Sequence, residues 1–215
     1  MQAFSNERGL PIVEAMIRTI QDNKTHLSEI DGMIGDGDHG TNMNKGFTLC
    51  EERLQAMDAS FLEGLQVLGD ILFSEIGGSM GPIYGTIFME MAGAVKTPSR
   101  IDEHAFLAML EAGIAGLDEI IEAKVGDKTL MDVLLPARDA FSGAVRDGKD
   151  FRQALDDMVQ ACVAGRDATV GMVARFGRSS RLGERSRGVL DAGAASCCLL
   201  LQAMAKGINE LLEDI

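Results

Sequence analysis

Apolar side chains recur at steps of three and four residues along most of the chain, which is the period of an amphipathic helix. The clearest stretch lies between Asp102 and Lys124. One stripe there collects the apolar positions Phe106, Met109, Leu110, Gly113, Ile114, Leu117, Ile120 and Ile121. The same period predicts about eight helices in all. They are expected over residues 7–23, 40–57, 61–76, 82–96, 102–124, 129–146, 150–173 and 191–213, with a short additional turn near residues 25–30.

No stretch alternates apolar and polar residues in the way a half-buried strand does. Composition also favours helices over strands, because methionine is frequent at 13 residues, tryptophan is absent and only 5 % of residues are aromatic. Glycine-rich connections separate the helices, at residues 35–40, 77–85, 126–129 and 177–193. No linker divides two compositions, so we expect an all-α fold in which residues 1–215 form a single domain.

Charge and cysteine usage narrow the class of protein. The net charge is −13, from 20 basic and 33 acidic residues, which disfavours nucleic acid and an anionic membrane surface as partners. No apolar run reaches the roughly 18 residues that span a bilayer, and no charged-then-apolar leader opens the chain. The cysteines Cys50, Cys162, Cys197 and Cys198 include no CxxC pair. They predict reduced, mostly buried thiols of a cytoplasmic protein.

The richest stretch for chemistry is an acidic loop. Asp31, Asp36 and Asp38 fall within eight residues and are separated by glycines, which allow carboxylates to converge. Converging carboxylates need a cation between them, and hard oxygen ligands suit Mg²⁺ or Ca²⁺. An EF-hand is excluded because its twelfth position would be Phe47. Residues 35–40 match the G-x-G-x-x-G fingerprint of dinucleotide-binding proteins, but no strand precedes them, so this interpretation also fails. The remaining alternative is a structural turn in which Asp38 caps the next helix.

Two further turns have a structural and a ligand-binding interpretation. Residues 77–82 join two apolar segments, and Pro82 suits the first turn of a helix whose backbone amides can hold an anion. The structural alternative is that these glycines are small residues that allow two helices to pack closely. Residues 126–129 form a turn before a helix, with Asp127 as the expected cap.

Arginines crowd one segment of this acidic chain. They are Arg175, Arg178, Arg181, Arg185 and Arg187, interleaved with glycine and serine. A phosphate clamp, a partner-docking patch and a flexible solvated loop all fit this pattern. Of the histidines only His39 lies in a functional-looking loop, and no Ser, His and Cys grouping indicates a nucleophilic triad.

Taken together, these loops resemble the nucleotide-binding subunit of the dihydroxyacetone kinase family. The resemblance covers nearly the whole chain, and the motifs occur in the family's order and spacing. They are residues 35–43 (GDGDHGTNM), 77–86 (GGSMGPIYGT), 126–129 (GDKT), 177–186 (GRSSRLGERS) and 191–193 (DAG). The sequence departs from the family in two places. Met80 stands where a small hydroxyl residue is usual, and residues 191–196 read DAGAAS instead of DPGATS.

The resemblance implies an eight-helix antiparallel barrel with the nucleotide site in loops at one end. It implies that Asp31, Asp36 and Asp38 hold two Mg²⁺ ions that bridge the phosphates of ADP or ATP. Arg178 would stabilise charge on the moving phosphoryl group. The implied nucleotide site consists of His39, Gly40, Thr41, Asn42, Ser79, Met80, Thr129, Leu130, Arg178, Asp191, Ala192 and Gly193.

The resemblance also implies partners. In this family a histidine of a separate substrate subunit holds the sugar covalently, here dihydroxyacetone or a related short ketose such as a tetrulose. Bound ADP would be recharged by a phosphocarrier protein of the phosphoenolpyruvate-dependent phosphotransferase system, which a chain without a fused substrate domain favours. The alternatives are exchangeable ATP as the donor, and a non-catalytic module that senses nucleotide for a protein such as a transcription factor. A homodimer is an open alternative to a monomer.

Overall fold

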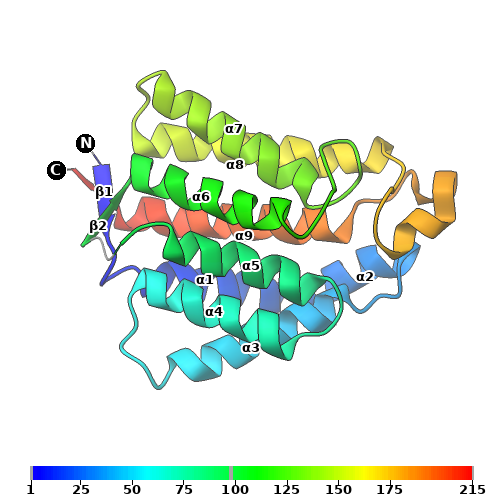
Figure 1. Ribbon diagram of the computed structural model, residues 1–215, viewed down its shortest axis with the longest axis horizontal. Coiled ribbons are helices and arrows are strands. Elements are labelled where there is room, and N and C mark those ends of the chain that lie inside the picture. The colour runs from blue at the N-terminus through cyan, green and yellow to red at the C-terminus, as the bar shows by residue number, and fades with distance from the viewer. Residues whose placement is uncertain (1, 97–98, 215) are drawn as a thin grey trace.

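The periodic segments fold into helices that run side by side along the long axis of the molecule (Figure 1). The computed structural model describes residues 2–96 and 99–214. The α-helices within that part of the chain are α1 (Leu10–Asp22), α2 (Lys24–Ile34), α3 (His39–Leu54), α4 (Phe61–Glu75), α5 (Met80–Gly93), α6 (Glu103–Asp118), α7 (Met131–Arg146), α8 (Phe151–Ala168) and α9 (Ala192–Leu211). Two 3₁₀ segments, η1 (Thr169–Gly171) and η2 (Arg178–Ser186), lie between α8 and α9.

The helices close into a barrel. From α4 to α9 each helix packs on the next one along the chain, and α9 returns to pack on α1. Helix α1 contacts both α3 and α4, which completes the ring. Helix α2 extends beyond the ring at one end, where it contacts α3 and α9 (Figure 1). The expected all-α fold is therefore confirmed.

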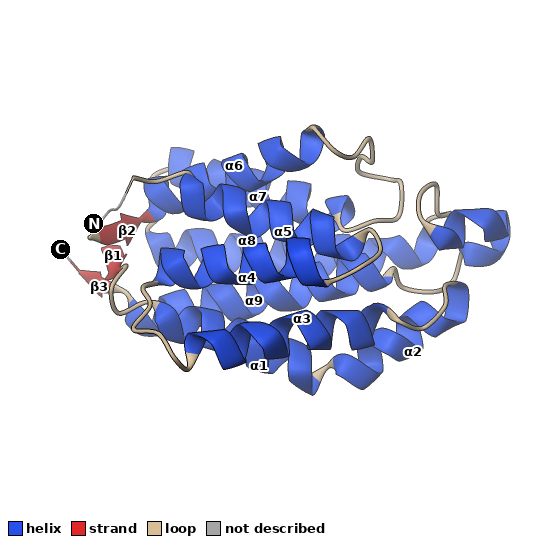
Figure 2. Cartoon of the chain, turned by 60° about the horizontal axis from the view of Figure 1, so that its bottom comes forward, coloured by secondary structure: helices blue, strands red, loops and turns tan. Residues whose placement is uncertain are grey.

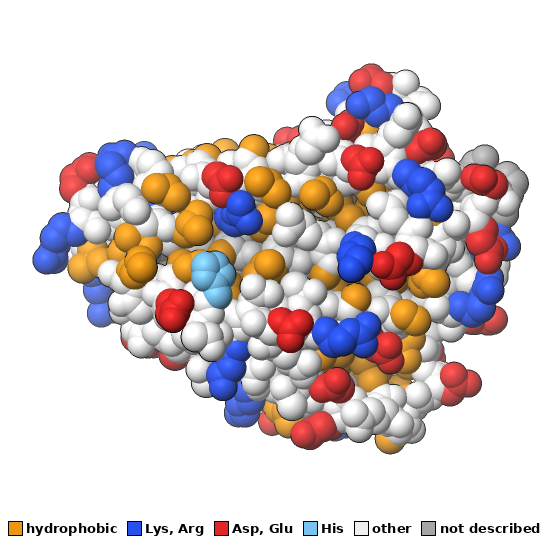
Figure 3. All heavy atoms as spheres, turned by 180° about the vertical axis from the view of Figure 1, so that it is seen from behind, with side chains coloured by type: hydrophobic (Ala, Val, Ile, Leu, Met, Phe, Trp, Pro, Cys, Tyr) orange, Lys and Arg blue, Asp and Glu red, His pale blue; other side chains and the backbone are white. Residues whose placement is uncertain are grey.

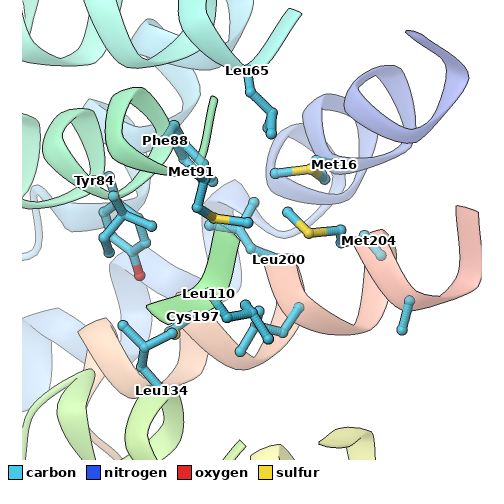
Figure 4. Close-up of a cluster of buried hydrophobic side chains, with 14 of the residues drawn as sticks. Met16, Leu65, Tyr84, Phe88, Met91, Leu110, Leu134, Cys197, Leu200 and Met204 are labelled. Carbon is cyan, nitrogen blue, oxygen red and sulfur yellow. The ribbon is translucent and has the colours of Figure 1, made fainter. Parts of the chain in front are cut away.

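The barrel interior is a packed apolar core. Figure 4 shows Met16 of α1, Met91 of α5 and Met204 of α9 in the same buried layer, where their flexible side chains fill gaps between helices. Phe106, Phe141 and Phe151 form a second cluster, with ring centroids 5.2 to 5.8 Å apart. The opening left in the first layer measures only about 20 Å³, which is room for about one water. A larger ligand must therefore bind elsewhere.

The structure adds three short strands that the sequence did not predict. They are β1 (Gln2–Ser5), β2 (Arg100–Asp102) and β3 (Glu213–Asp214), antiparallel in the order β2-β1-β3. Segments this short show no readable alternation. The sheet closes the end of the barrel where both termini lie (Figure 2). There Glu213 forms ion pairs with Arg8 and Arg100.

The helix boundaries differ from the sequence prediction at one end of the barrel. The expected turn near residues 25–30 is a full helix, α2, which the bend at Asn23 separates from α1. The helix expected over 102–124 stops at Asp118, and the helix expected over 150–173 stops at Ala168, where the Thr169 hydroxyl bonds to Arg166 O. The other boundaries agree to within about one helical turn.

The surface carries both signs of charge. On the face behind the view of Figure 1, acidic and basic side chains are interspersed rather than gathered into one area (Figure 3). Among the described residues, no helix combines the length and the apolar character needed to cross a bilayer.

Close packing of α7 and α8 at Gly165 generates a stability prediction. A Cβ at Gly165 would overlap Asp132 O and would lie 3.3 Å from Val133 Cα, so the helices would have to separate. We expect Gly165→Ala to lower the free energy of unfolding by roughly 1–3 kcal/mol, measured by urea denaturation. The matched control is Gly143→Ala in α7. A Cβ there meets only the end of the Arg146 side chain, and the change should stabilise by up to about 1 kcal/mol. Equal effects of the two changes would contradict the packing argument.

Candidate functional site

A cavity of about 640 Å³ opens at the end of the barrel opposite the sheet. Its walls come from the connections between α2 and α3, α4 and α5, and α6 and α7, together with the segment around η2 and the start of α9. The volume lies in the range typical of small-molecule and cofactor sites. The cavity therefore gathers the glycine-rich connections that the sequence marks out.

Three carboxylates converge on one side of this cavity. Asp31 lies in the last turn of α2, and Asp36 and Asp38 lie in the connection to α3. One ligand atom from each lies within 4.8 Å of the others. The side chain of Asp38 makes no capping bond to α3, so the structural-turn alternative does not account for it. The set offers hard oxygen ligands, which fits Mg²⁺.

Backbone geometry keeps the acidic connection tight. Gly37 has a φ of +78°, in the left-handed region that glycine favours, between the two exposed aspartates. The backbone N–H of His39 donates to Asp31 Oδ2 at 3.3 Å, and Gly35 N donates to Asp31 O at 2.6 Å. The half-buried Asp31 therefore anchors the connection that carries Asp36 and Asp38.

A buried chain of hydrogen bonds fixes the ring of His39. Its Nε2 lies 2.9 Å from Ser196 Oγ on α9, and Ser196 Oγ lies 2.7 Å from the Tyr84 hydroxyl on α5. The Tyr84 hydroxyl also donates to Gly193 O at 3.2 Å. Burial lowers the pKa of His39, although the nearby charge of Asp31 acts in the opposite direction. Three helices, α3, α5 and α9, are thus joined next to the cavity.

The arginine-rich segment contains the 3₁₀ segment η2, which packs against α2 while its arginines stay exposed. Arg178, at its start, lines the cavity and forms an ion pair with the Asp36 carboxylate. Arg175 pairs with Asp127 at 3.5 Å, and Arg187 pairs with Glu184 at 3.0 Å. Of the clustered arginines only Arg178 faces the cavity among the described residues.

The turn before α7 is held by two carboxylates. Asp132 accepts hydrogen bonds from Gly126 N at 2.5 Å and Thr129 N at 2.8 Å. Asp127 accepts one from Lys124 N at 2.8 Å, so it closes the turn and does not cap α7. These bonds present Thr129 and the following leucine to the cavity.

The glycine connection lies partly on the cavity and partly against α4. Gly77 and Gly78 are exposed and line the cavity with Ser79 and Met80. Gly81 instead packs against the end of α4, where a Cβ would overlap backbone oxygens. The open glycines thus serve the cavity, and the buried one serves helix packing.

Most residues of the implied site meet at the cavity. Two do not: Gly40 and Thr41 are absent from its walls. Gly40 is buried where a Cβ would overlap Lys24 O and lie 2.7 Å from Ser28 N, and Thr41 faces solvent. The residues that line the cavity as expected are Asp31, Asp36, Asp38, His39, Asn42, Ser79, Met80, Thr129, Leu130, Arg178, Asp191, Ala192 and Gly193.

The structure also brings in residues that the sequence did not single out. The apolar residues Ile121, Ala123 and Phe176 line the cavity, as do Lys128 and Tyr84. Tyr84 is the sole tyrosine of the chain and lies within the glycine motif, which is the one signal that could have marked it. The apolar lining residues had no such signal, because Ile121 follows the helical stripe of the preceding segment.

Fold and site together define a class: an all-helical barrel with an acidic, ligand-sized cavity at one end. A family model described as the DAK2 domain matches residues 33–206, and the chain belongs to that family. The resemblance stated from the sequence is therefore confirmed.

Curated relatives agree over most of their length. A protein of Listeria innocua serovar 6a, named PEP-dependent dihydroxyacetone kinase 1, ADP-binding subunit DhaL, is 36 % identical over 186 residues, or 86 % of this chain and 88 % of that protein. The ADP-binding subunit DhaL of the PEP-dependent dihydroxyacetone kinase of Escherichia coli K12 is 34 % identical over 188 residues, or 86 % of this chain and 89 % of that protein.

A solved structure shares the fold. The native form of the dihydroxyacetone kinase of C. freundii superposes with a TM-score of 0.70 at 22 % identity, covering 92 % of this chain and 34 % of that one. The same kinase in complex with AMP-PNP and Mg²⁺ gives a TM-score of 0.64 at 21 % identity, covering 91 % and 33 %. This chain thus spans about a third of that kinase.

Asp191 at the cavity generates a pH prediction. Its carboxylate caps α9 by accepting from Ala194 N at 2.8 Å, and burial raises its pKa to about 6. An unfolded aspartate titrates near 3.9, so the folded protein binds more protons between about pH 4 and pH 6. Stability is therefore lost as the pH rises through this window, by up to about 3 kcal/mol.

Asp191→Asn keeps an acceptor for Ala194 N but carries no charge. The unfolding free energy of the variant, relative to the parent, should therefore rise by roughly 2–3 kcal/mol between pH 4 and pH 7 in urea titrations. Asp102→Asn, which replaces the capping carboxylate of α6 outside the cavity, controls for the exchange itself. A difference that stays constant with pH would contradict the burial of the Asp191 charge.

Proposed function

We propose that residues 1–215 act as a single nucleotide-binding domain that transfers a phosphoryl group from Mg-nucleotide. The acceptor is dihydroxyacetone, or a related short ketose, held covalently on a separate substrate subunit. ADP stays bound and is recharged by a phosphocarrier of the phosphotransferase system, in line with the names of the relatives. One observation carries the proposal: Asp31, Asp36, Asp38 and Arg178 meet at one end of a nucleotide-sized cavity in a DAK2-family chain.

The acidic side of the cavity suits the phosphates once metal is present. Magnesium, held as two ions by Asp31, Asp36 and Asp38, supplies neutralisation of charge on the phosphate oxygens. Arg178 lies beside Asp36 on a separate segment, so its guanidinium reaches the same region and can stabilise charge on the moving group. His39 and Asn42, at the start of α3, lie beside these carboxylates and orient the phosphate end of the nucleotide.

The apolar part of the cavity lining suits a base. The apolar lining residues offer surface against which a planar purine can lie; they are Ile121, Ala123, Leu130 and Phe176. No cavity residue needs to act as a nucleophile, because phosphoryl transfer depends mainly on positioning and charge neutralisation. The acceptor hydroxyl comes from the partner's sugar, which agrees with an open cavity at the end of the barrel.

Nucleotide content and transfer test this function directly. The purified protein is desalted and denatured, and the supernatant is analysed by ion-exchange chromatography. Near-stoichiometric ADP supports the bound-cofactor version, whereas an empty protein that binds Mg-ATP and Mg-ADP reversibly supports exchangeable ATP. A protein that binds neither contradicts the proposal. Nucleotide binding without phosphoryl transfer to a ketose-loaded substrate subunit would favour the non-catalytic sensing module.

The carboxylate site predicts a metal-dependent effect of Asp36→Asn. The amide keeps the shape of the side chain but removes a charge that holds magnesium, so Mg-ADP affinity should fall by roughly 100-fold while the far-ultraviolet dichroism stays unchanged. Isothermal titration with and without Mg²⁺ measures the effect. Asp58→Asn, in the exposed connection before α4, is the matched control. Unchanged magnesium dependence in Asp36→Asn would refute the metal assignment.

Arg178 predicts a separation of binding from transfer. Arg178→Gln removes a charge that acts mainly on the moving phosphoryl group, so the transfer rate to the ketose-loaded subunit should fall by roughly 10²–10³-fold. Mg-ADP affinity should change far less. Arg181→Gln, three residues along the same exposed segment, should leave the rate unchanged. Equal losses of rate and affinity in Arg178→Gln would instead indicate a binding role alone.

A further inference from the structure

Lys128 differs from the other cavity residues because it is a buried cation in an unusual backbone conformation. Its side chain is 1 % exposed. Its φ of +62° lies in the left-handed region, and no other non-glycine residue of the described chain has a positive φ. Such a conformation persists where surrounding contacts fix it. Those contacts identify what the residue does.

The Lys128 ammonium donates hydrogen bonds to three backbone carbonyls. Its Nζ lies 2.5 Å from Val189 O, 2.7 Å from Thr169 O and 3.4 Å from Met172 O. An ammonium has three donors and no acceptor. The chain itself therefore uses the whole hydrogen-bonding capacity of this lysine, and none remains for a ligand.

The bonded carbonyls belong to segments far apart in the sequence. Thr169 and Met172 follow α8, Val189 precedes α9, and Lys128 itself precedes α7. Direct bonds join the same segments: Asp191 N donates to Thr169 Oγ1 at 3.1 Å. Between the two segments that flank η2, Gly188 N also donates to Val170 O at 2.8 Å. Lys128 lies at the centre of this junction.

Each segment continues directly into a wall of the cavity. Thr129 and Leu130 follow Lys128, residues 176–179 follow the segment after α8, and residues 191–193 follow Val189. Loss of the hydrogen bonds at this junction would therefore displace all three of these parts of the cavity lining. The three donors of Lys128 thus supply part of the bonding on which the placement of these walls depends.

We propose that Lys128 is a positioning residue for the nucleotide site. Its ammonium holds the turn before α7, the segment after α8 and the segment before α9 in mutual register, and it makes no contact with the phosphates. This inference rests on the proposed function, because it assigns the cavity walls to a nucleotide. This positioning role differs from the usual role of a lysine near phosphate, which is to contact the phosphate directly as a point charge.

The charges around Lys128 act on its pKa in opposite directions. Burial lowers the pKa of Lys128, the charges of Asp191 and Asp132 oppose that effect, and the charge of Arg187 adds to it. Carbonyl oxygens accept from the ammonium in preference to the neutral amine, which keeps the cation in the junction.

Lys128→Met tests the junction because the side chain keeps its length and loses all three donors. Amide hydrogen exchange should accelerate at residues 169–175 and 187–191 and stay unchanged in α4. Affinity for Mg-ADP should fall by roughly tenfold or more, and affinity for AMP by the same factor, since the walls rather than the phosphate contacts are displaced. Lys124→Met, an exposed lysine on the same turn, should change neither measurement.

Chemical rescue gives a readout that a purely structural loss would not show. In Lys128→Ala, added n-propylammonium should restore Mg-ADP affinity with a saturating concentration dependence, because it returns an ammonium to the junction. Tetramethylammonium, which has no N–H donor, should not restore affinity. If Lys128→Met does not fold, Lys128→Gln, which keeps an amide donor, should show the same local acceleration of exchange on a smaller scale.

Two outcomes overturn the proposal. One is a Lys128→Met protein whose exchange at residues 169–175 and 187–191 matches the parent. The other is a loss of affinity confined to ADP with AMP unaffected, which would make Lys128 a phosphate ligand. A parent protein that binds no nucleotide would refute the proposed function instead. The exchange comparison would then still decide whether Lys128 joins the three segments.

Discussion

Mutual repulsion of three carboxylates is the constraint around which one end of this barrel is arranged. Asp31, Asp36 and Asp38 present oxygen atoms within 4.8 Å of one another, which is unfavourable without a neighbouring positive charge. The chain supplies one such charge from a distant segment, because Arg178 at the start of η2 pairs with Asp36. Helix α2, which ends just before Asp36, also contacts η2. A site that needs cations is thus built where the chain can place both signs of charge together.

The helices of the barrel form the frame, and the connections at one end form the cavity. Packed helices form a frame whose central opening among the described residues is too small for a ligand, and the sheet closes the end that carries the termini. The opposite end is made from connections that leave their helices early. Helix α6 stops at Asp118 although the apolar stripe continues, and Ile121 and Ala123 then line the cavity. The local sequence pattern favours a longer helix there, and the shape of the site overrides it, as is expected at functional positions.

The sequence predicted what depends on local pattern. Helical stripes gave the barrel helices, and glycines between aspartates gave the acidic connection. It did not predict features that depend on distant partners. Lys128 looked like part of an ordinary turn, and only the fold brings Thr169 and Val189 to its ammonium. Gly40 belonged to a nucleotide motif by resemblance, yet its lack of a side chain serves the close approach of α2 and α3.

The departures from the family pattern lie partly in the core and partly on the cavity. Ala195 is 3 % exposed and belongs to the core, so its methyl in place of a hydroxyl residue alters packing beneath α9 and not the cavity surface. Met80 and Ala192 do line the cavity. Met80 brings a flexible thioether to a position where a hydroxyl would offer a hydrogen bond, which makes that wall more apolar. The aspartates and Arg178 are retained, so the variation falls on the shape of the cavity while its charge arrangement persists.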